Sequence, residues 1–221
     1  RPRAVLFDLF HTLVDLNDAP GEASSALLGI DPLVWNRKIM YEAAHHALGE
    51  ISDPYESVRR IAHEVDPAIP EERIRRAVEA RPRRFRHALR HVRPPILDGL
   101  RALRALDLPL ALVSNAGLDE IEAWEESPLA ALIDAPVFSC LARLMKPDPG
   151  IYRHAAERLG VAPADCLFVG DGGSHEHEGA RAAGMRTVLF LYFLLESAPT
   201  IAAARPRNTD HEVRSMSELL A

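Results

Sequence analysis

The stretch AVLFDLFHTLVD, residues 4–15, decides the fold. It opens with the apolar run AVLF, which is typical of a buried parallel strand. Asp8 follows this run directly, and open α/β sheets bind their ligands in the crevice beyond the carboxyl ends of their strands. An Asp after a strand also serves as a turn former or as a helix N-cap. Taken alone, Asp8 leaves both roles open.

Three more polar residues follow strand-like runs further along the chain. Ser114 ends LPLALVS, Lys146 follows PVFS and a short loop, and Asp171 follows CLFVG. The carboxyl ends of parallel strands meet at one edge of a sheet, so these residues are expected to lie near Asp8. Their recurrence favours a functional site over four unrelated turns.

From residue 96 onward, strand patterns alternate with helical patterns. Helices are expected at residues 96–106, 118–125, 150–160 and 179–183, and strands at residues 108–114, 136–139, 166–170 and 187–191. This alternation predicts an α/β fold with a Rossmann-like parallel sheet and right-handed crossovers.

The segment between the first and second motifs has a different character. It holds helical patterns at residues 33–49, 55–65 and 71–92, separated by prolines, and no convincing strand. The sequence therefore predicts a catalytic core formed by residues 1–15 and 92–221, with an inserted all-helical domain at residues 16–91.

Composition favours a small intracellular enzyme. The 221 residues are 48% hydrophobic and carry a net charge of −6, so the chain offers no basic face for nucleic acid. The longest apolar run, residues 188–195, is far shorter than the roughly 20 residues that span a bilayer, and no leader opens the chain. We therefore expect a cytoplasmic monomer or homodimer that acts on a small molecule, without nucleic-acid or membrane partners. Cys140 and Cys166 are expected to be packed thiols.

Four motifs in this order resemble the signature of the haloacid dehalogenase (HAD) superfamily of hydrolases. They read FDLFHTL, LVSNAG, MKPDPGIY and FVGDGGSHEHEGARAAGM, and the resemblance runs from residue 3 to about residue 185. It implies an aspartate nucleophile and a helical (C1-type) cap at residues 16–91, which would close over the site and exclude water.

The resemblance assigns catalytic roles to the first three motifs. Asp8 is the expected nucleophile, which splits a difficult hydrolysis into formation and breakdown of an aspartyl ester. Thr12 would hold the turn after it, where backbone amides could cradle anionic oxygens. Ser114 and Asn115 would hydrogen-bond a phosphoryl oxygen or a substrate carboxylate, although Ser114 is also a candidate N-cap. Lys146 would neutralise the charges of the nucleophile and the substrate.

The fourth motif resembles the acidic pair that holds Mg²⁺ in this superfamily. Asp171 and Glu176 form the pair here, and Glu176 replaces the more usual Asp. By resemblance, Asp8 and the backbone carbonyl of Phe10 complete the metal site. Hard oxygen ligands suit Mg²⁺.

Other polar residues carry weaker expectations. His175 and His177 flank Glu176, but further Cys or His ligands at suitable spacing are lacking, so we expect exposed loop histidines and no zinc site. Basic residues of the insert, among them His46, Arg81 and Arg84, are candidates to contact an anionic substrate. Most of these basic residues are expected on solvated helix faces.

Phe10 departs from the phosphatase pattern. Members that hydrolyse phosphate esters commonly carry a second Asp at this position, which acts as general acid and then as general base. Phenylalanine can do neither, and His11 is a candidate substitute. We expect Phe10 and His11 to line the substrate pocket together with Ser114 and Asn115.

An aromatic residue at this position also resembles the 2-haloacid dehalogenases, in which Asp attacks carbon and halide leaves without a proton. The first motif thus favours attack on carbon, whereas the acidic pair favours attack on phosphorus. The sequence favours a Mg²⁺-dependent phosphatase of a small phosphorylated metabolite, with a 2-haloacid dehalogenase as the alternative. A third reading is a catalytically degenerate member that only binds a ligand.

Overall fold

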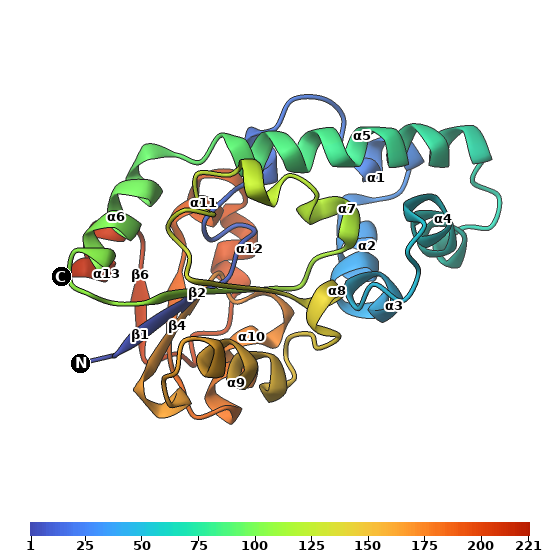
Figure 1. The fold of residues 1–221 in the computed structure, drawn as a ribbon. Coiled ribbons are helices and arrows are strands. Elements are labelled where there is room, and N and C mark those ends of the chain that lie inside the picture. Colours follow the sequence, from blue (N-terminus) through green and yellow to red (C-terminus); the bar gives the residue numbers. More distant parts are fainter.

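The computed structural model describes residues 1–221, apart from the side chains of Met40 and Tyr41. Its centre is a parallel sheet of six strands in the order β3-β2-β1-β4-β5-β6 (Figure 1). The strands are β1 (Ala4–Phe7), β2 (Leu110–Ser114), β3 (Ala135–Phe138), β4 (Cys166–Gly170), β5 (Arg186–Phe190) and β6 (His211–Val213). This topology confirms the predicted α/β fold.

The two faces of the sheet are both covered, as the continuous apolar runs require. In β1, Val5 and Phe7 point into one core cluster, whereas Ala4 and Leu6 point into another. Alternate residues of a strand face opposite sides, so one short strand contributes to two apolar layers.

Helices from the second half of the chain form the outer layers. On one face, α9 and α10 pack against the strands, and on the other face lie α6, α11 and α13 (Figure 1). The bounds are α6 (Pro94–Arg104), α9 (Pro149–Arg158), α10 (Glu176–Ala182), α11 (Tyr192–Ser197), α12 (Pro199–Ala204) and α13 (Met216–Leu220). Short turns of 3-10 helix are η1 (Leu16–Asp18), η3 (Trp124–Glu126), η4 (Pro163–Asp165) and η5 (Gly173–His175).

The chain between β1 and β2 is helical. Its elements are α1 (Ser24–Leu28), α2 (Pro32–Arg37), the π-helical turn η2 (Lys38–Glu42), α3 (Ala44–Ala47), α4 (Pro54–Val65) and α5 (Glu71–Arg90). Apolar side chains from α1, α2, α4 and α5 form a separate buried cluster that includes Trp35, Ile61 and Ile74.

The long helix α5 belongs to two clusters. Ile74 and Ala77 lie in the cluster of the helical segment, whereas Ala88 and Leu89 pack with side chains of the sheet. Figure 1 shows α5 running along one side of the molecule, from the helical segment to the sheet. A cut at residue 91 would therefore remove side chains that pack in the core of the sheet, and the predicted domain boundary stays a prediction.

Two predicted helices are interrupted. The helix expected at residues 33–49 is divided into α2, η2 and α3, because Ala43 has φ −90° and ψ 61°. The helix expected at residues 118–125 ends as α7 (Leu118–Ile121), and the chain continues into η3, where Trp124 packs edge-on against Phe138. The short helix α8 (Ser139–Ala142) and strand β6 were not predicted.

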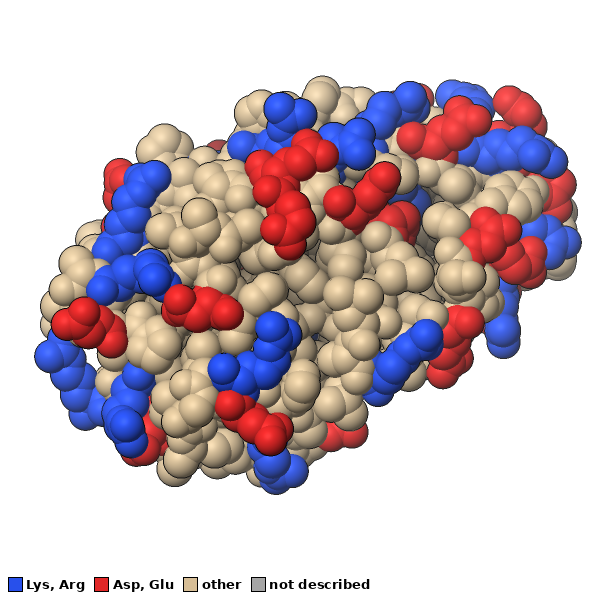
Figure 2. Space-filling model, in the orientation of Figure 1, with Lys and Arg blue, Asp and Glu red and all other residues tan. Residues whose placement is uncertain are grey.

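Charged side chains of both signs intermingle on the face shown in Figure 2. Many charged side chains of the molecule are paired, as Arg93 is with Asp18 and Glu196. In the described part of the chain, no helix has the length and apolar character needed to cross a membrane.

Candidate functional site

The order of the strands gathers the predicted site residues at one edge of the sheet. Strand β1 lies between β2 and β4, so Asp8, Ser114 and Asp171 follow neighbouring strands. Lys146 comes from the loop between α8 and α9, and Glu176 is the first residue of α10. Residues up to 168 positions apart in the sequence thus face one another.

Lys146 joins two carboxylates. Its Nζ donates to Asp8 Oδ1 at 2.5 Å and to Glu176 Oε2 at 2.6 Å. The second oxygen of Asp8 accepts from Thr12 Oγ1 at 2.9 Å, and Glu176 Oε1 accepts from the Gly172 amide at 2.8 Å. Because each carboxylate oxygen has a donor, the orientations of Asp8 and Glu176 are fixed.

These groups are shielded from water. The side chains of Lys146 and Glu176 are only 4% and 1% exposed. Burial alone would lower the pKa of Lys146, but the adjacent charges of Asp8 and Glu176 outweigh it and raise that pKa above its ordinary value. Burial raises the pKa of Glu176, and the nearby Asp8 and Asp171 raise it further.

Asp171 is held by a different cation. Its Oδ1 accepts from the Gly173 amide at 3.0 Å, and its Oδ2 lies 2.5 Å from Arg205 Nη2. Arg205 follows α12 and was not predicted as a site residue.

The acidic residues are close enough to share a cation. Asp8, Asp171 and Glu176 each offer a ligand oxygen, and these oxygens all lie within 4.8 Å of one another. Carboxylate oxygens are hard donors, which suit Mg²⁺. The donor set therefore suits a divalent cation, which would displace the Arg205 guanidinium from Asp171 and share the oxygens of Asp8 and Glu176 with their present donors.

The turn after β1 holds an additional ion pair. His11 adopts φ 62°, and its Nδ1 lies 3.2 Å from Asp15 Oδ1. Burial lowers the pKa of His11, but the charges of Asp15, Asp171 and Asp8 outweigh it and raise that pKa above its ordinary value. Burial raises the pKa of Asp15, yet the contacts with His11 and Asn17 bring it down to about 2. The His11 amide donates to the Val14 carbonyl at 2.6 Å, so it serves the turn.

Ser114 and Asn115 differ in their bonding. The buried Ser114 Oγ has no hydrogen-bond partner among the described residues. The proposed N-cap role of Ser114 is wrong, because Gly117 is the N-cap of α7. Asn115 binds the backbone of Lys146 at both ends, with its Oδ1 accepting from the amide at 2.7 Å and its Nδ2 donating to the carbonyl at 2.9 Å. Asn115 therefore positions the loop that carries Lys146.

Phe10 packs against the helical segment. Its ring meets that of Phe85 on α5 edge-on, with centroids 5.2 Å apart, and the guanidinium of Arg81 lies over Phe85 at 5.2 Å from the ring centroid. Edge-on aromatic contact thus joins the turn after Asp8 to α5.

Arg81 is an exception to the expectation that most basic residues of the insert lie on solvated helix faces. Its side chain is buried and donates to Asp119 at 2.8 Å and also to Glu120. His46 lies 3.3 Å from Glu120, and Ser57 lies 3.0 Å from the other ring nitrogen of His46. This ionic cluster links α3 and α5 to α7, the helix that follows Ser114.

The two histidines that flank Glu176 differ in exposure. His175 is largely exposed, as expected. His177 is buried, and its Nε2 lies 3.1 Å from the Val188 carbonyl, so the expectation of exposure was wrong for this residue. Burial lowers the pKa of His177 to about 4. This histidine connects α10 to β5.

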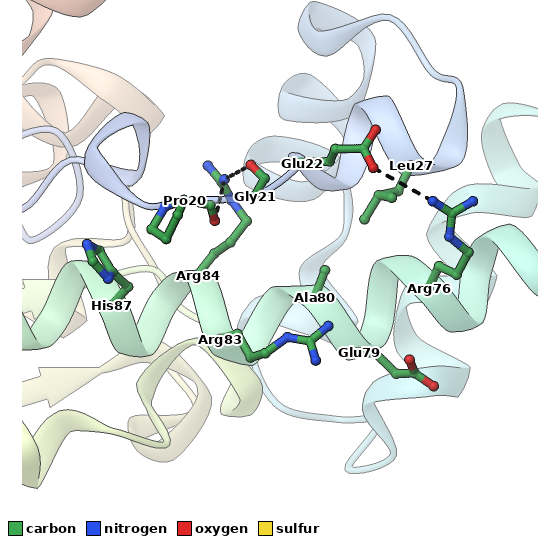
Figure 3. Close-up of a pocket in the computed structure, with 10 residues that line it drawn as sticks. All are labelled: Pro20, Gly21, Glu22, Leu27, Arg76, Glu79, Ala80, Arg83, Arg84 and His87. Carbon is green, nitrogen blue, oxygen red and sulfur yellow. Dashed lines mark hydrogen bonds and ion pairs between the residues drawn. The ribbon is translucent and has the colours of Figure 1, made fainter.

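A groove of about 550 Å³ lies along α5 and contains no residue of the four motifs, although Arg84, a candidate for substrate contact, lines it (Figure 3). Arg84, on its wall, donates to the carbonyls of Ala19 at 2.9 Å and Leu16 at 2.8 Å. In Figure 3, Arg84 points toward Pro20 and Gly21, and Arg76 points toward Glu22. The contacts of Arg84 tie α5 to the segment that leaves the first motif.

Sequence reasoning missed Arg205, Asp15 and Tyr152. The Tyr152 hydroxyl donates to the Glu176 carbonyl at 2.7 Å and so supports the start of α10. Asp15 and Tyr152 carried a sequence signal, since Asp15 lies four residues after His11 at the end of AVLFDLFHTLVD and Tyr152 ends the MKPDPGIY motif. Arg205 lies in a segment with no motif.

The fold and this cluster define an α/β protein with a buried ionic site at the carboxyl edge of a parallel sheet. A family model described as a haloacid dehalogenase-like hydrolase matches residues 2–184. The chain belongs to this family of hydrolases, which confirms the resemblance in its motifs.

Relatives carry the names of two activities. A phosphoglycolate phosphatase of Shigella boydii serotype 4 is 30% identical over 213 residues, which cover 86% of this chain and 81% of the relative. The (S)-2-haloacid dehalogenase 1 of a Pseudomonas species is 25% identical over 224 residues, covering 98% of this chain and 94% of the relative. The solved structure of L-2-haloacid dehalogenase from Xanthobacter autotrophicus with chloropropionic acid covalently bound has a TM-score of 0.69 at 21% identity, covering 99% of this chain and 97% of that one. This last likeness shows the shared fold.

Proposed function

We propose that the chain is a Mg²⁺-dependent phosphatase that hydrolyses the monoester of a small phosphorylated metabolite. The observation that carries the proposal is the convergence of Asp8, Asp171 and Glu176, whose oxygens lie within 4.8 Å of one another. Displacement of halide from carbon needs no divalent cation, whereas phosphoryl transfer gains from one. The relative named phosphoglycolate phosphatase supports the same choice.

In the proposed reaction an Asp8 oxygen attacks phosphorus, the bond from phosphorus to the ester oxygen breaks, and the leaving alkoxide takes up a proton from solvent, which the attacking water gives back in the second step. Water then attacks phosphorus, the bond to Asp8 breaks, and inorganic phosphate leaves. Lys146 places positive charge beside the reacting groups, and Thr12 fixes the carboxylate. The Ser114 hydroxyl, which has no hydrogen-bond partner among the described residues, would donate to a phosphoryl oxygen.

Asp8, Asp171, Glu176 and the Phe10 carbonyl are the groups that we assign to Mg²⁺. When bound there, the cation would neutralise charge on the oxygens of the phosphoryl group.

We also infer that residues 16–91 act as a cap on a core formed by residues 1–15 and 92–221. Asp8, Lys146 and Glu176 are nearly covered, and Phe85 of α5 packs on Phe10 beside them. Entry of a substrate therefore requires the helical segment to move, and its return would exclude bulk water while the ester forms.

A 2-haloacid dehalogenase is the second candidate. It is favoured by the aromatic contact of Phe10 with Phe85, and by the protein donors that hold the oxygens of the acidic cluster. In that reaction Asp8 attacks carbon, the carbon–halogen bond breaks, and halide leaves without a proton. The Pseudomonas relative carries this activity in its name.

A substrate screen tests the proposal. Purified protein is incubated with phosphate monoesters, beginning with phosphoglycolate, and with 2-haloacids, each in Mg²⁺ and in chelator. We expect release of phosphate in Mg²⁺ and its loss in chelator. Release of halide in chelator would reject the proposed phosphatase activity in favour of the dehalogenase activity. Release of neither product would favour a catalytically degenerate binding protein.

A further inference from the structure

The segment after α12 brings a second cation to the acidic cluster. Arg205 Nη2 lies 2.5 Å from Asp171 Oδ2, and the two side chains are 14% and 5% exposed. A pair so shielded from water is screened little by salt, and its charge-assisted hydrogen bond is strong. Arg205 therefore holds an oxygen of a carboxylate that the proposed function assigns to Mg²⁺.

The turn between β4 and α10 leaves room for this arginine. Gly172 has φ +85°, and a Cβ at that residue would lie 3.4 Å from Arg205 Cδ. A Cβ on Gly173 would lie 3.4 Å from Arg205 Nη2 and 3.1 Å from Asp171 Oδ1. The glycines thus allow the bend of the turn, as the φ of Gly172 shows, and the guanidinium lies in ordinary van der Waals reach of this turn beside the carboxylate.

We propose that Arg205 sets the metal occupancy of the site by competing with Mg²⁺ for Asp171. In the metal-free protein the guanidinium neutralises this carboxylate, and it must leave when the cation binds. The proposal rests on the assignment of Asp171 as a metal ligand under the proposed function.

The competition follows from charge and from the number of oxygens. Asp171 Oδ1 already accepts from the Gly173 amide, and Oδ2 accepts from Arg205. Mg²⁺ binds carboxylate oxygens at about 2.0–2.1 Å, and a second positive group on the same oxygen would repel it. The apparent affinity for Mg²⁺ is therefore the intrinsic affinity multiplied by the fraction of molecules in which Arg205 is not bound to Asp171.

Calorimetric titration of the metal-free protein with Mg²⁺ tests the proposal. Arg205→Gln should bind Mg²⁺ roughly 10- to 100-fold more tightly than the wild type, because it removes one charge-assisted competitor. Arg205→Lys keeps the positive charge with fewer N–H donors, and its affinity for Mg²⁺ should lie between those of the wild type and Arg205→Gln. The matched control is Arg207→Gln, since Arg207 is on the same segment but pairs with Glu212, and it should bind as the wild type does.

Thermal unfolding in chelator provides a readout without metal. Arg205→Gln should lower Tm relative to Arg207→Gln, and the difference should be smaller in an Asp171→Asn background, where the partner charge is absent. Saturating Mg²⁺ should also narrow the difference. If Arg205→Gln does not fold, the affinity of Arg205→Lys for Mg²⁺, compared with that of the wild type, tests the proposal instead.

Equal or weaker Mg²⁺ binding by the Arg205 variants overturns the proposal, as does a lack of Mg²⁺ binding by every variant. Failure of the proposed function looks different. Tighter binding by Arg205→Gln together with release of halide alone would keep the competition and reject the phosphatase. Mg²⁺-dependent phosphate release with unchanged affinity in Arg205→Gln would do the reverse.

Discussion

At the scale of single residues, Asp8 is held as a reacting group requires. Lys146 binds one of its oxygens and Thr12 binds the other, so little reorganisation is needed before attack. Positive charge from Lys146 also favours the approach of an anionic substrate.

Replacing Asp8 by Asn should lower turnover by more than about 10³-fold, because the amide is not a nucleophile. The change keeps the volume of the side chain, so we expect a folded protein with an unchanged circular dichroism spectrum. Steady-state rates measure the loss. Asp98→Asn is a matched control, because Asp98 is exposed and pairs only with Arg101 among the described residues, and it should retain full activity. Turnover by Asp8→Asn within tenfold of the wild type would exclude the covalent mechanism.

The leaving group reports on the missing acid at Phe10. A phosphatase without a general acid expels an unprotonated alkoxide, so wild-type rates should fall steeply from aryl to alkyl phosphates. Phe10→Asp should raise alkyl ester hydrolysis by up to roughly 10²- to 10⁴-fold and change aryl ester hydrolysis little. The loss of the contact with Phe85 and a new charge near Asp8 will reduce this gain.

Phe10→Leu is the control, since it removes the ring without adding an acid and should not raise alkyl ester hydrolysis. Wild-type rates that do not depend on the leaving group would contradict the prediction. They would mean that another group, such as His11, donates the proton or that a later step limits turnover, and burst kinetics separate these two cases.

Residues with their own motif were predictable, and residues that act across the fold were not. Asp8, Lys146, Asp171 and Glu176 stand in recognisable strings, and the structure brings them into one cluster. Arg205 reaches Asp171 only because α12 returns the chain to the turn after β4, which no local pattern encodes. The assignment of these residues to catalysis and metal binding stays a prediction.

At the scale of elements, the strands were predicted best. Residues 166–170 form β4 as expected, and β1, β2, β3 and β5 match within two residues at each end, because buried parallel strands are continuous apolar runs. The interrupted helices failed because tertiary packing, as of Trp124 on Phe138, overrides helical periodicity.

Helix α10 approaches the Lys146 loop so closely that one position must be glycine. A Cβ at Gly179 would lie 2.2 Å from the Pro147 carbonyl oxygen. Helix propensity alone would favour Gly179→Ala by about 1 kcal/mol, yet the clash with backbone should make the variant less stable by about 1–3 kcal/mol. Its turnover should also fall, because the loop that carries Lys146 would move from Glu176.

Urea unfolding and steady-state rates measure these two effects. Glu178→Ala changes an exposed neighbour on the same helix and should leave both quantities near those of the wild type. A stabilised Gly179→Ala protein would show that the helix and the loop can separate at no cost.

At the scale of the whole molecule, a buried ionic cluster joins the helical segment to the sheet. Arg81 of α5 binds Asp119 and Glu120 of α7, and His46 of α3 lies against Glu120. Removing one member leaves a buried charge with one partner fewer, so the cluster makes docking of the segment sensitive to charge.

The cluster should make stability depend on pH in acid. Burial raises the pKa of Glu120, but His46 and Arg81 lower it more, and it falls from 4.5 to about 2. Between these values the unfolded chain binds a proton that the folded protein does not, so stability from Glu120 is complete above about pH 4.5 and is lost as the pH falls toward 2. The free energy of unfolding of the wild type should therefore drop by about 1–3 kcal/mol more than that of Glu120→Gln across this range.

Urea titrations at a series of pH values measure the difference, and Glu122→Gln, at an exposed residue 3.7 Å from Arg86, should follow the wild type. Parallel curves for the wild type and Glu120→Gln would show that Asp119 alone balances Arg81, and that Glu120 does not hold the helical segment to the sheet.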